Sequence, residues 1–151
     1  MANASLPAPS KHAPEPEHTV GTWKVFVSYD YDNDAKHKNL LLAWAKNSDF
    51  AFSMNDQSVD IDVESHDSAE IKRVISAAIG AAPYFLCLVG EETHKNKWVA
   101  WEIAKAVELE KRLVAVKIDA HNESPAGLLN QGASWVLSFT LDGITKAIDA
   151  A

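Results

Sequence analysis

Six consecutive apolar residues, Tyr84–Val89, limit what this chain can fold into more than any other stretch. The run is bounded by Pro83 and Gly90, and it is too short for an ordinary helix. It lacks the polar alternation of a strand with one face in water, so both of its faces must be covered. Strands of this kind lie at the centre of parallel sheets, between layers of helices. The run therefore predicts a buried central strand in an α/β protein.

Strand and helix patterns alternate on both sides of this central strand. β-branched and aromatic residues mark strands, whereas apolar residues at a 3.6 period mark helices. The expected strands cover residues 23–29, 50–54, 84–89, 113–118 and 135–139, and the expected helices cover residues 35–47, 67–82, 98–111 and 141–150. Short connections between these elements favour right-handed crossovers. We therefore expect a flavodoxin-like three-layer sandwich, with a five-stranded parallel sheet in the strand order 2-1-3-4-5.

Two of the expected helices carry details that a structure can test. Asp67 and Glu70 have the spacing of a capping box at the start of the second helix. The core face of that helix is expected to comprise Ile71, Val74, Ile75, Ala78 and Ile79. The core face of the third helix is expected to comprise Val99, Ile103, Ala106 and Val107, with Trp98 and Glu102 at its margin.

The composition indicates a proline-rich N-terminal segment followed by one folded domain. Residues 1–21 contain four of the six prolines and few large apolar side chains, so we expect a disordered N-terminal segment. The remaining residues, 22–151, suit a single domain. A net charge of −7 argues against a nucleic-acid partner. No apolar run approaches the ~20 residues that cross a membrane, and no signal-peptide core is present, so we expect a cytoplasmic protein without membrane contact.

Several common functional sites are missing from the sequence. There is no Gly-rich phosphate loop, and the six histidines lack metal-ligand spacing, so we expect neither a metal nor a bound cofactor. The central strand ends at Val89-Gly90, without the aspartate that a phospho-receiver domain needs. Cys87 is the only cysteine, and within an apolar strand it is expected to pack as a small hydrophobe.

Trp98 and Glu102 are spaced to share one face of the helix that follows the central strand. Open α/β sheets build their sites at this end of the strands. A carboxylate beside a flat ring suits a ligand that is flat, cationic and linked to a sugar. The alternative is an ordinary amphipathic helix, with a tryptophan that pins it to the sheet and a glutamate in water.

Three segments together resemble the TIR domain, and more narrowly the bacterial TIR-like proteins of the Thoeris anti-phage system. These segments are Val25–Asp30 (VFVSYD), Cys87–Gly90 (CLVG) and Trp98–Ile103 (WVAWEI). The resemblance spans residues 24 to about 119, and the C-terminal third carries no matching motif. The first segment alone is weakly specific, whereas the Trp-x-x-x-Glu pattern is moderately specific.

The resemblance implies an enzyme that cleaves NAD at the nicotinamide–ribose bond, with Glu102 as the catalytic residue. It further implies that the ADP-ribose part becomes a signalling nucleotide for a downstream effector, and we expect this nucleotide to be cyclic. NAD is then a substrate and not a cofactor, and other TIR subunits are expected as partners in a homo-oligomer or filament. The residues expected to line the substrate cleft are Ser28, Tyr29, Asp30, Asp56, Gly90, Thr93 and Trp98.

The chemistry of NAD fits a single carboxylate. Glycoside hydrolases usually need two carboxylates, because an acid must protonate the leaving oxygen. Nicotinamide leaves a cationic ring as a neutral molecule and needs no such proton. One carboxylate is then enough to hold the ribose and stabilise its developing positive charge.

Other interpretations stay open at the level of sequence. Tyr29 can be plain packing, Asp30 can cap the first helix together with Asp32 and Asp34, and Asp56 can belong to a solvated acidic loop. The whole domain can also be a non-catalytic TIR adaptor that acts by homotypic assembly. A nucleoside deoxyribosyltransferase-like enzyme, which has a related fold and also uses a glutamate, is the third possibility.

Overall fold

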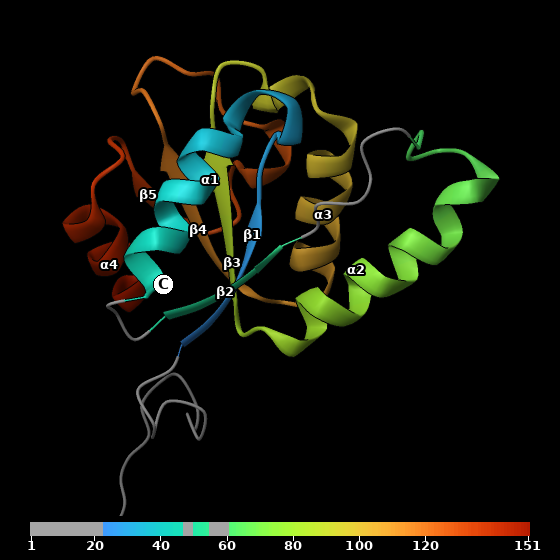
Figure 1. The fold of residues 1–151 in the computed structure, drawn as a ribbon, viewed down its shortest axis with the longest axis horizontal. Helices are drawn as coiled ribbons and strands as arrows, with labels where there is room; N and C mark the ends of the chain where they lie inside the picture. The colour runs from blue at the N-terminus through green and yellow to red at the C-terminus, as the bar shows by residue number, and fades with distance from the viewer. Residues whose placement is uncertain (1–22, 47–49, 55–60) are drawn as a thin grey trace, which may run out of the picture.

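The computed structural model describes residues 23–46, 50–54 and 61–151, which form one parallel sheet between two layers of helices (Figure 1). The strand order is β2-β1-β3-β4-β5, as the sequence predicts. The strands are β1 (Trp23–Ser28), β2 (Phe50–Met54), β3 (Tyr84–Val89), β4 (Arg112–Lys117) and β5 (Ser134–Val136). The helices are α1 (Tyr31–Ala45), α2 (Ala69–Ala81), α3 (Lys97–Glu108) and α4 (Leu141–Ala150), with short 3-10 turns at His66–Ser68, Thr93–Lys95 and Ala126–Leu128.

The side chains of the strands alternate between two hydrophobic cores. Val27 and Leu86 face α1 and α4, whereas Phe26 and Phe85 face α2 and α3, where their rings stack with centroids 5.9 Å apart. Figure 1 shows α1 and α4 on one side of the sheet and α2 and α3 on the other. All six residues of β3 are buried, so the prediction of a central strand covered on both faces is confirmed.

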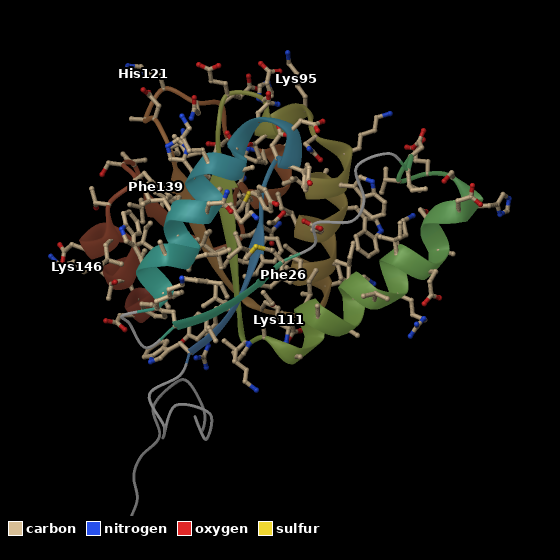
Figure 2. All side chains as sticks on the ribbon, viewed as in Figure 1. Phe26, Lys95, Lys111, His121, Phe139 and Lys146 are labelled. Atoms are coloured by element: carbon tan, nitrogen blue, oxygen red, sulfur yellow. The ribbon has the colours of Figure 1, made fainter. Side chains whose placement is uncertain are left out.

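One edge of the sheet collects the carboxyl ends of the strands, because every strand pairs in parallel. Lys95 and His121, which follow β3 and β4, lie at this edge, whereas Lys111, which precedes β4, lies at the opposite edge (Figure 2). α3 begins beside the end of β3. The ends of β1 and β3 therefore lie near the first turns of α3.

Several element boundaries differ from the sequence-based expectation, and two of these differences have a clear cause. α1 begins at Tyr31 and not at residue 35, because the carbonyl of Asp30 accepts hydrogen bonds from the backbone N–H groups of Asn33 (3.2 Å) and Asp34 (2.8 Å). β5 ends at Val136, and Phe139 leaves the sheet to stack on Trp44 of α1, with ring centroids 5.1 Å apart. Phe139 lies between α1 and α4 in Figure 2.

Two expectations about the α2 region are wrong. No side chain caps α2; the Ser68 hydroxyl instead donates to the carbonyls of Val63 (3.0 Å) and Ser65 (2.8 Å), which builds the 3-10 turn before the helix. Val74 is 48% exposed and does not belong to the core face, which is formed by the buried Ile75 and Ile79 with the partly buried Ile71 and Ala78. None of the helices in the described part of the chain is long and apolar enough to cross a membrane.

The N-terminal segment 1–21 and Asp56 lie outside the described residues.

Candidate active site

A buried hydrogen bond joins the two residues that carry the site. Glu102 of α3 is only 4% exposed, and its Oε1 accepts from the hydroxyl of Ser28 at 2.6 Å. Ser28 is the last residue of β1 and is itself buried. A carboxylate pays a large desolvation cost unless it is hydrogen-bonded, and a short O–H···O⁻ bond is among the stronger kinds. The structure therefore places Glu102 inward, over the end of β1. The sequence had suggested a position at the margin of the core face of this helix.

The direction of side chains along β1 explains why Ser28 meets α3. Phe26 packs in the core below α2 and α3, and Ser28, two residues later, points to the same face. Ser28 lies opposite Cys87 in the register of β1 and β3. Burial, and then the nearby charge of Glu102, raise the pKa of the Cys87 thiol far above its usual value. Cys87 is thus an unreactive part of the floor below Glu102, in agreement with the sequence interpretation.

Tyr29 lies on the opposite face of the sheet from Ser28. Its side chain belongs to the core below α1 and α4, where its ring lies 6.2 Å from that of Tyr31 and 5.5 Å from the Nζ of Lys38. The structure therefore does not bring Tyr29 together with Glu102, and the packing interpretation describes its position.

Trp98 is attached by its indole nitrogen to the segment that leads into α2. Its Nε1 donates to the carbonyl of Ile61 at 2.8 Å, and its ring meets Trp101 edge to face at 6.1 Å. The ammonium groups of Lys72 on α2 and Lys105 on α3 lie 5.6 and 5.7 Å from the centre of the Trp101 ring, so Trp101 serves as a packing residue between α2 and α3. Trp98 therefore ties the start of α3 to the segment before α2 through a hydrogen bond, a role that the spacing of Trp98 and Glu102 did not indicate.

Asp30 and Asn96 link the end of β1 to the start of α3. The Oδ1 of Asn96 caps α3 by accepting from the backbone N–H of Val99 at 2.9 Å, and its Nδ2 donates to Asp30 at 3.3 Å. The other oxygen of Asp30 accepts from the side chain of Asn33 at 2.7 Å. Asp30 is the N-cap residue of α1, but its side chain does not cap that helix. Asn96 was not predicted from the sequence, although an asparagine directly before a helix is a recognised capping signal.

Gly90 and Thr93 hold the loop after β3 against α1. The backbone N–H of Gly90 donates to the Thr93 hydroxyl at 2.8 Å, and that hydroxyl lies 3.3 Å from the Oδ2 of Asp34. A side chain at residue 90 would clash with Asp34, because a Cβ there would lie 2.3 Å from the same oxygen. Burial and then the charge of Asp30 raise the pKa of Asp34, and the hydrogen bond from Thr93 partly opposes this shift.

A separate pocket of about 300 Å³ opens at this edge of the sheet, on the α1 side. Its lining includes four carboxylates, those of Asp34, Glu91, Glu92 and Asp119, and neither Ser28 nor Glu102 belongs to it. Such a lining repels the pyrophosphate of a dinucleotide.

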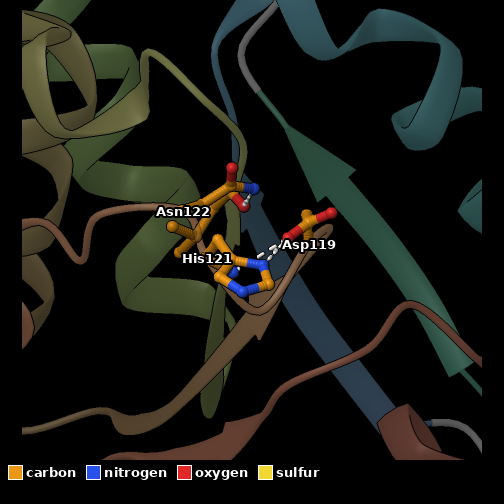
Figure 3. Close-up of polar contacts among 4 residues, drawn as sticks. Asp119, His121 and Asn122 are labelled. Atoms are coloured by element: carbon orange, nitrogen blue, oxygen red, sulfur yellow. Dashed lines mark hydrogen bonds and ion pairs between the residues drawn. The ribbon is translucent and has the colours of Figure 1, made fainter.

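Part of the lining of this pocket, Ile118, Asp119 and Asn122, comes from the segment after β4. Figure 3 shows the polar contacts of this segment. Asp119 accepts from the backbone N–H of His121 (2.9 Å), and its Oδ1 lies 3.0 Å from the His121 ring nitrogen. These contacts lower the pKa of Asp119. The Nδ2 of Asn122 donates to the carbonyl of Val89 at 2.9 Å and so ties this segment to the end of β3. Within the described ranges, no group of three His, Cys, Asp or Glu side chains is placed to hold a metal ion.

Comparison with known families decides what kind of domain this is. The family model described as Thoeris protein ThsB, TIR-like domain, matches residues 26–123. The chain belongs to this family. The ThsB match includes the end of β1, the whole of β3 and α3, and all of Ser28, Gly90, Thr93, Trp98 and Glu102, and it ends before β5 and α4.

A curated relative and two solved structures extend the comparison. The relative, named "Putative cyclic ADP-D-ribose synthase ThsB1", from Bacillus cereus (strain MSX-D12), is 23% identical over 112 residues, which cover 72% of this chain and 58% of the relative. A 2-deoxyribosyltransferase from Bacillus psychrosaccharolyticus shares the fold, with a TM-score of 0.58, 12% identity and coverage of 77% of this chain and 87% of that one. The TIR domains of the activated Roq1 resistosome give a TM-score of 0.46, 20% identity and coverage of 63% and 57%. This last TM-score is too low to support a conclusion.

Proposed function

We propose that this ThsB-family protein cleaves NAD at the nicotinamide–ribose bond, with Glu102 as the catalytic carboxylate. The observation that carries the proposal is the buried Ser28–Glu102 hydrogen bond of 2.6 Å at the carboxyl edge of the sheet. A fixed carboxylate at that edge is suited to stabilise positive charge on a bound ribose. The name of the Bacillus cereus relative, a cyclic ADP-ribose synthase, supports the same class of substrate.

The reaction breaks the bond between C1′ of the ribose and the ring nitrogen of nicotinamide. The bonding electron pair leaves with nicotinamide, which becomes neutral, and positive charge develops on the ribose. Glu102 stabilises this charge. Attack by water then gives ADP-ribose and a proton, whereas attack by a nucleophilic atom of the same molecule gives a cyclic product and a proton. NAD is the substrate, and no cofactor is required.

Other residues of the site have supporting roles in this proposal. Ser28 orients Glu102, while Gly90 and Thr93 shape the loop beside the substrate and Trp98 supports the wall next to Glu102. Asp56, which lies outside the described residues, is the remaining candidate for a substrate contact. In the cell, we expect TIR subunits to assemble in the cytoplasm during anti-phage defence and the nucleotide product to activate an effector.

Nicotinamide release from NAD tests the proposal directly. Glu102→Gln keeps the size of the side chain and removes its charge, so we expect release to fall by about 10²-fold or more. Glu108→Gln is the matched control, because Glu108 lies exposed at the other end of α3 and pairs with Lys105 at the surface. Its activity should equal that of the wild type. Mass spectrometry of the product then distinguishes hydrolysis from cyclisation.

Two results would contradict the proposal. Cleavage of deoxynucleosides without cleavage of NAD would indicate the deoxyribosyltransferase-like alternative, whose fold the structural match shares. No nicotinamide release at high protein concentration, even with extract of phage-infected cells added as a source of trigger, would favour the adaptor.

A further inference from the structure

The Asn96 side chain has two separate partners, and only one of them is explained by helix capping. A cap needs an acceptor oxygen, and the Oδ1 of Asn96 provides it to Val99 at 2.9 Å. The amide Nδ2 plays no part in the cap. It reaches across to the Oδ1 of Asp30, at 3.3 Å, in the turn that follows β1.

The Asp30–Asn96 contact involves residues that are close in sequence to Ser28 and Glu102. Asp30 lies two residues after Ser28, and Asn96 lies six residues before Glu102. The Asp30–Asn96 contact and the Ser28–Glu102 contact therefore join the same two elements, the end of β1 and the first turns of α3.

Asp30 is well placed to be a fixed anchor for α3. Its side chain is 3% exposed, and its second oxygen is held by the Asn33 amide at 2.7 Å. A buried carboxylate held on both oxygens has little freedom to move, because losing either bond leaves a buried charge with less compensation.

We propose that the Asp30–Asn96 pair positions Glu102 against Ser28, so that Asp30 and Asn96 are positioning residues and not substrate contacts. The kinetic consequence rests on the proposed NAD cleavage. The pair sets how far α3 lies from the end of β1, and a misplacement of about 1 Å in a catalytic group is enough to cost about 10²-fold in rate.

Asn96→Asp separates positioning from capping. The aspartate keeps the cap oxygen, and an anion is favoured at a helix N-terminus, so α3 keeps its start. It removes the Nδ2 donor, however, and sets a second carboxylate against Asp30. The double variant Asp30→Asn/Asn96→Asp restores one donor and one carboxylate, with the two groups exchanged. Thr140→Asp is the control, since Thr140 caps α4 in the same way and lies outside the family match.

The test measures kcat, KM and Tm for nicotinamide release by these variants. We expect Asn96→Asp to lower kcat by about tenfold or more with little change in KM. The double variant should recover most of kcat, and Thr140→Asp should match the wild type. An unchanged kcat in Asn96→Asp, or a folded double variant that stays as slow as the single one, would overturn the proposal. If Asn96→Asp does not fold, Asn96→Ser replaces it, because serine caps a helix but cannot reach Asp30 with an amide.

A second readout does not depend on activity. The Glu102 carboxyl carbon can be followed by NMR over a pH titration, with Ser28→Ala as the reference for a lost contact. We expect Asn96→Asp to shift the Glu102 titration toward that of Ser28→Ala, and the double variant to restore it. If the wild type releases no nicotinamide, the proposed function fails, and this titration alone decides whether the pair positions Glu102. A titration in Asn96→Asp that equals the wild type would then refute the positioning role.

Discussion

Glu102 occupies a position that a glutamate adopts only with support from its surroundings. On the third helix, its neighbours in sequence, Trp101 and Ile103, pack in the core, and Glu102 itself is turned inward over the end of β1. The Ser28 hydroxyl supports the carboxylate at 2.6 Å. A merely solvated glutamate would not need such a contact, so the burial of Glu102 is the strongest reason to regard it as functional.

Trp98 provides a test that separates a ring contact from a hydrogen bond. Trp98→Phe keeps an aromatic ring but loses the indole N–H that donates to Ile61, so we expect a loss of about 0.5–1.5 kcal/mol in the free energy of unfolding. Trp101→Phe is the control, since no hydrogen bond of its indole is found among the described residues. Urea denaturation of both variants gives the comparison. Equal losses in the two variants would mean that the N–H of Trp98 contributes nothing specific.

At the level of elements, the segments that follow the neighbouring strands β1 and β3 contact each other. The loop after β3 rests on the first turn of α1 through Gly90, Thr93 and Asp34, and Asp34 departs from helical geometry there, with φ −117° and ψ 17°. Its carboxylate is buried against the Cα of Gly90. The loop between β3 and α3 therefore packs against the carboxyl group of Asp34, and burial opposes the ionisation of this group.

The raised pKa of Asp34 predicts how stability depends on pH. An acid whose pKa is higher in the folded state favours folding when protonated, and this contribution is lost as the pH rises through the folded-state value. The charged groups facing Asp34 are Asp30, His37 and Glu91, and burial is the largest cause of the shift. We therefore expect Asp34→Asn to raise Tm at neutral pH, with a gain that shrinks as the pH falls to about 4.

Thermal unfolding of Asp34→Asn from acid to neutral pH checks this expectation. Asp32→Asn serves as control, because Asp32 lies in the same first turn but is exposed. It should give no gain, since a carboxylate is favourable at a helix N-terminus. A Tm difference for Asp34→Asn that is the same at every pH would show that ionisation is not the cause.

For the molecule as a whole, the sheet lies between the candidate site and the hydrophobic core that packs against α1 and α4. Glu102 lies over the α2–α3 face, whereas α4 covers the other face with Ile144, Ala147 and Ile148. α4 also lies beyond the segment that matches the family model. Stability and activity should therefore be separable by substitutions on opposite faces.

Ile148→Ala tests this separation. Ile148 is fully buried, so we expect a loss of about 2–5 kcal/mol in the free energy of unfolding. Nicotinamide release per folded molecule should stay at the wild-type level, measured at a temperature where both proteins are folded. Leu137→Ala, at a side chain that is 59% exposed, is the control and should change neither quantity. A fall in kcat for folded Ile148→Ala would show that the two faces are coupled.

The architecture was predictable from local patterns, and the details of packing were not. The apolar run of β3 and the alternation of element types led to the correct strand order, because burial on both faces leaves a direct mark in sequence. The inward position of Val74 was predicted wrongly, because helical periodicity gives a face but not how much of that face a neighbouring layer covers. The boundary of β5 was also misplaced, since the apolar Phe139 packs on Trp44 of α1 and not within the sheet.

The candidate site shows the same division. Residue types, their order and the resemblance to TIR-like proteins were sufficient to select Glu102, Ser28 and Trp98 and to place them at the carboxyl edge of a parallel sheet. No local pattern joins Ser28 to Glu102 or Asp30 to Asn96, because the partners are 74 and 66 positions apart in the chain. Those contacts form only when the crossover from β1 through β2 and β3 brings α3 over the end of β1. Periodicity is a property of neighbouring residues, whereas the geometry of a site depends on elements that meet in space.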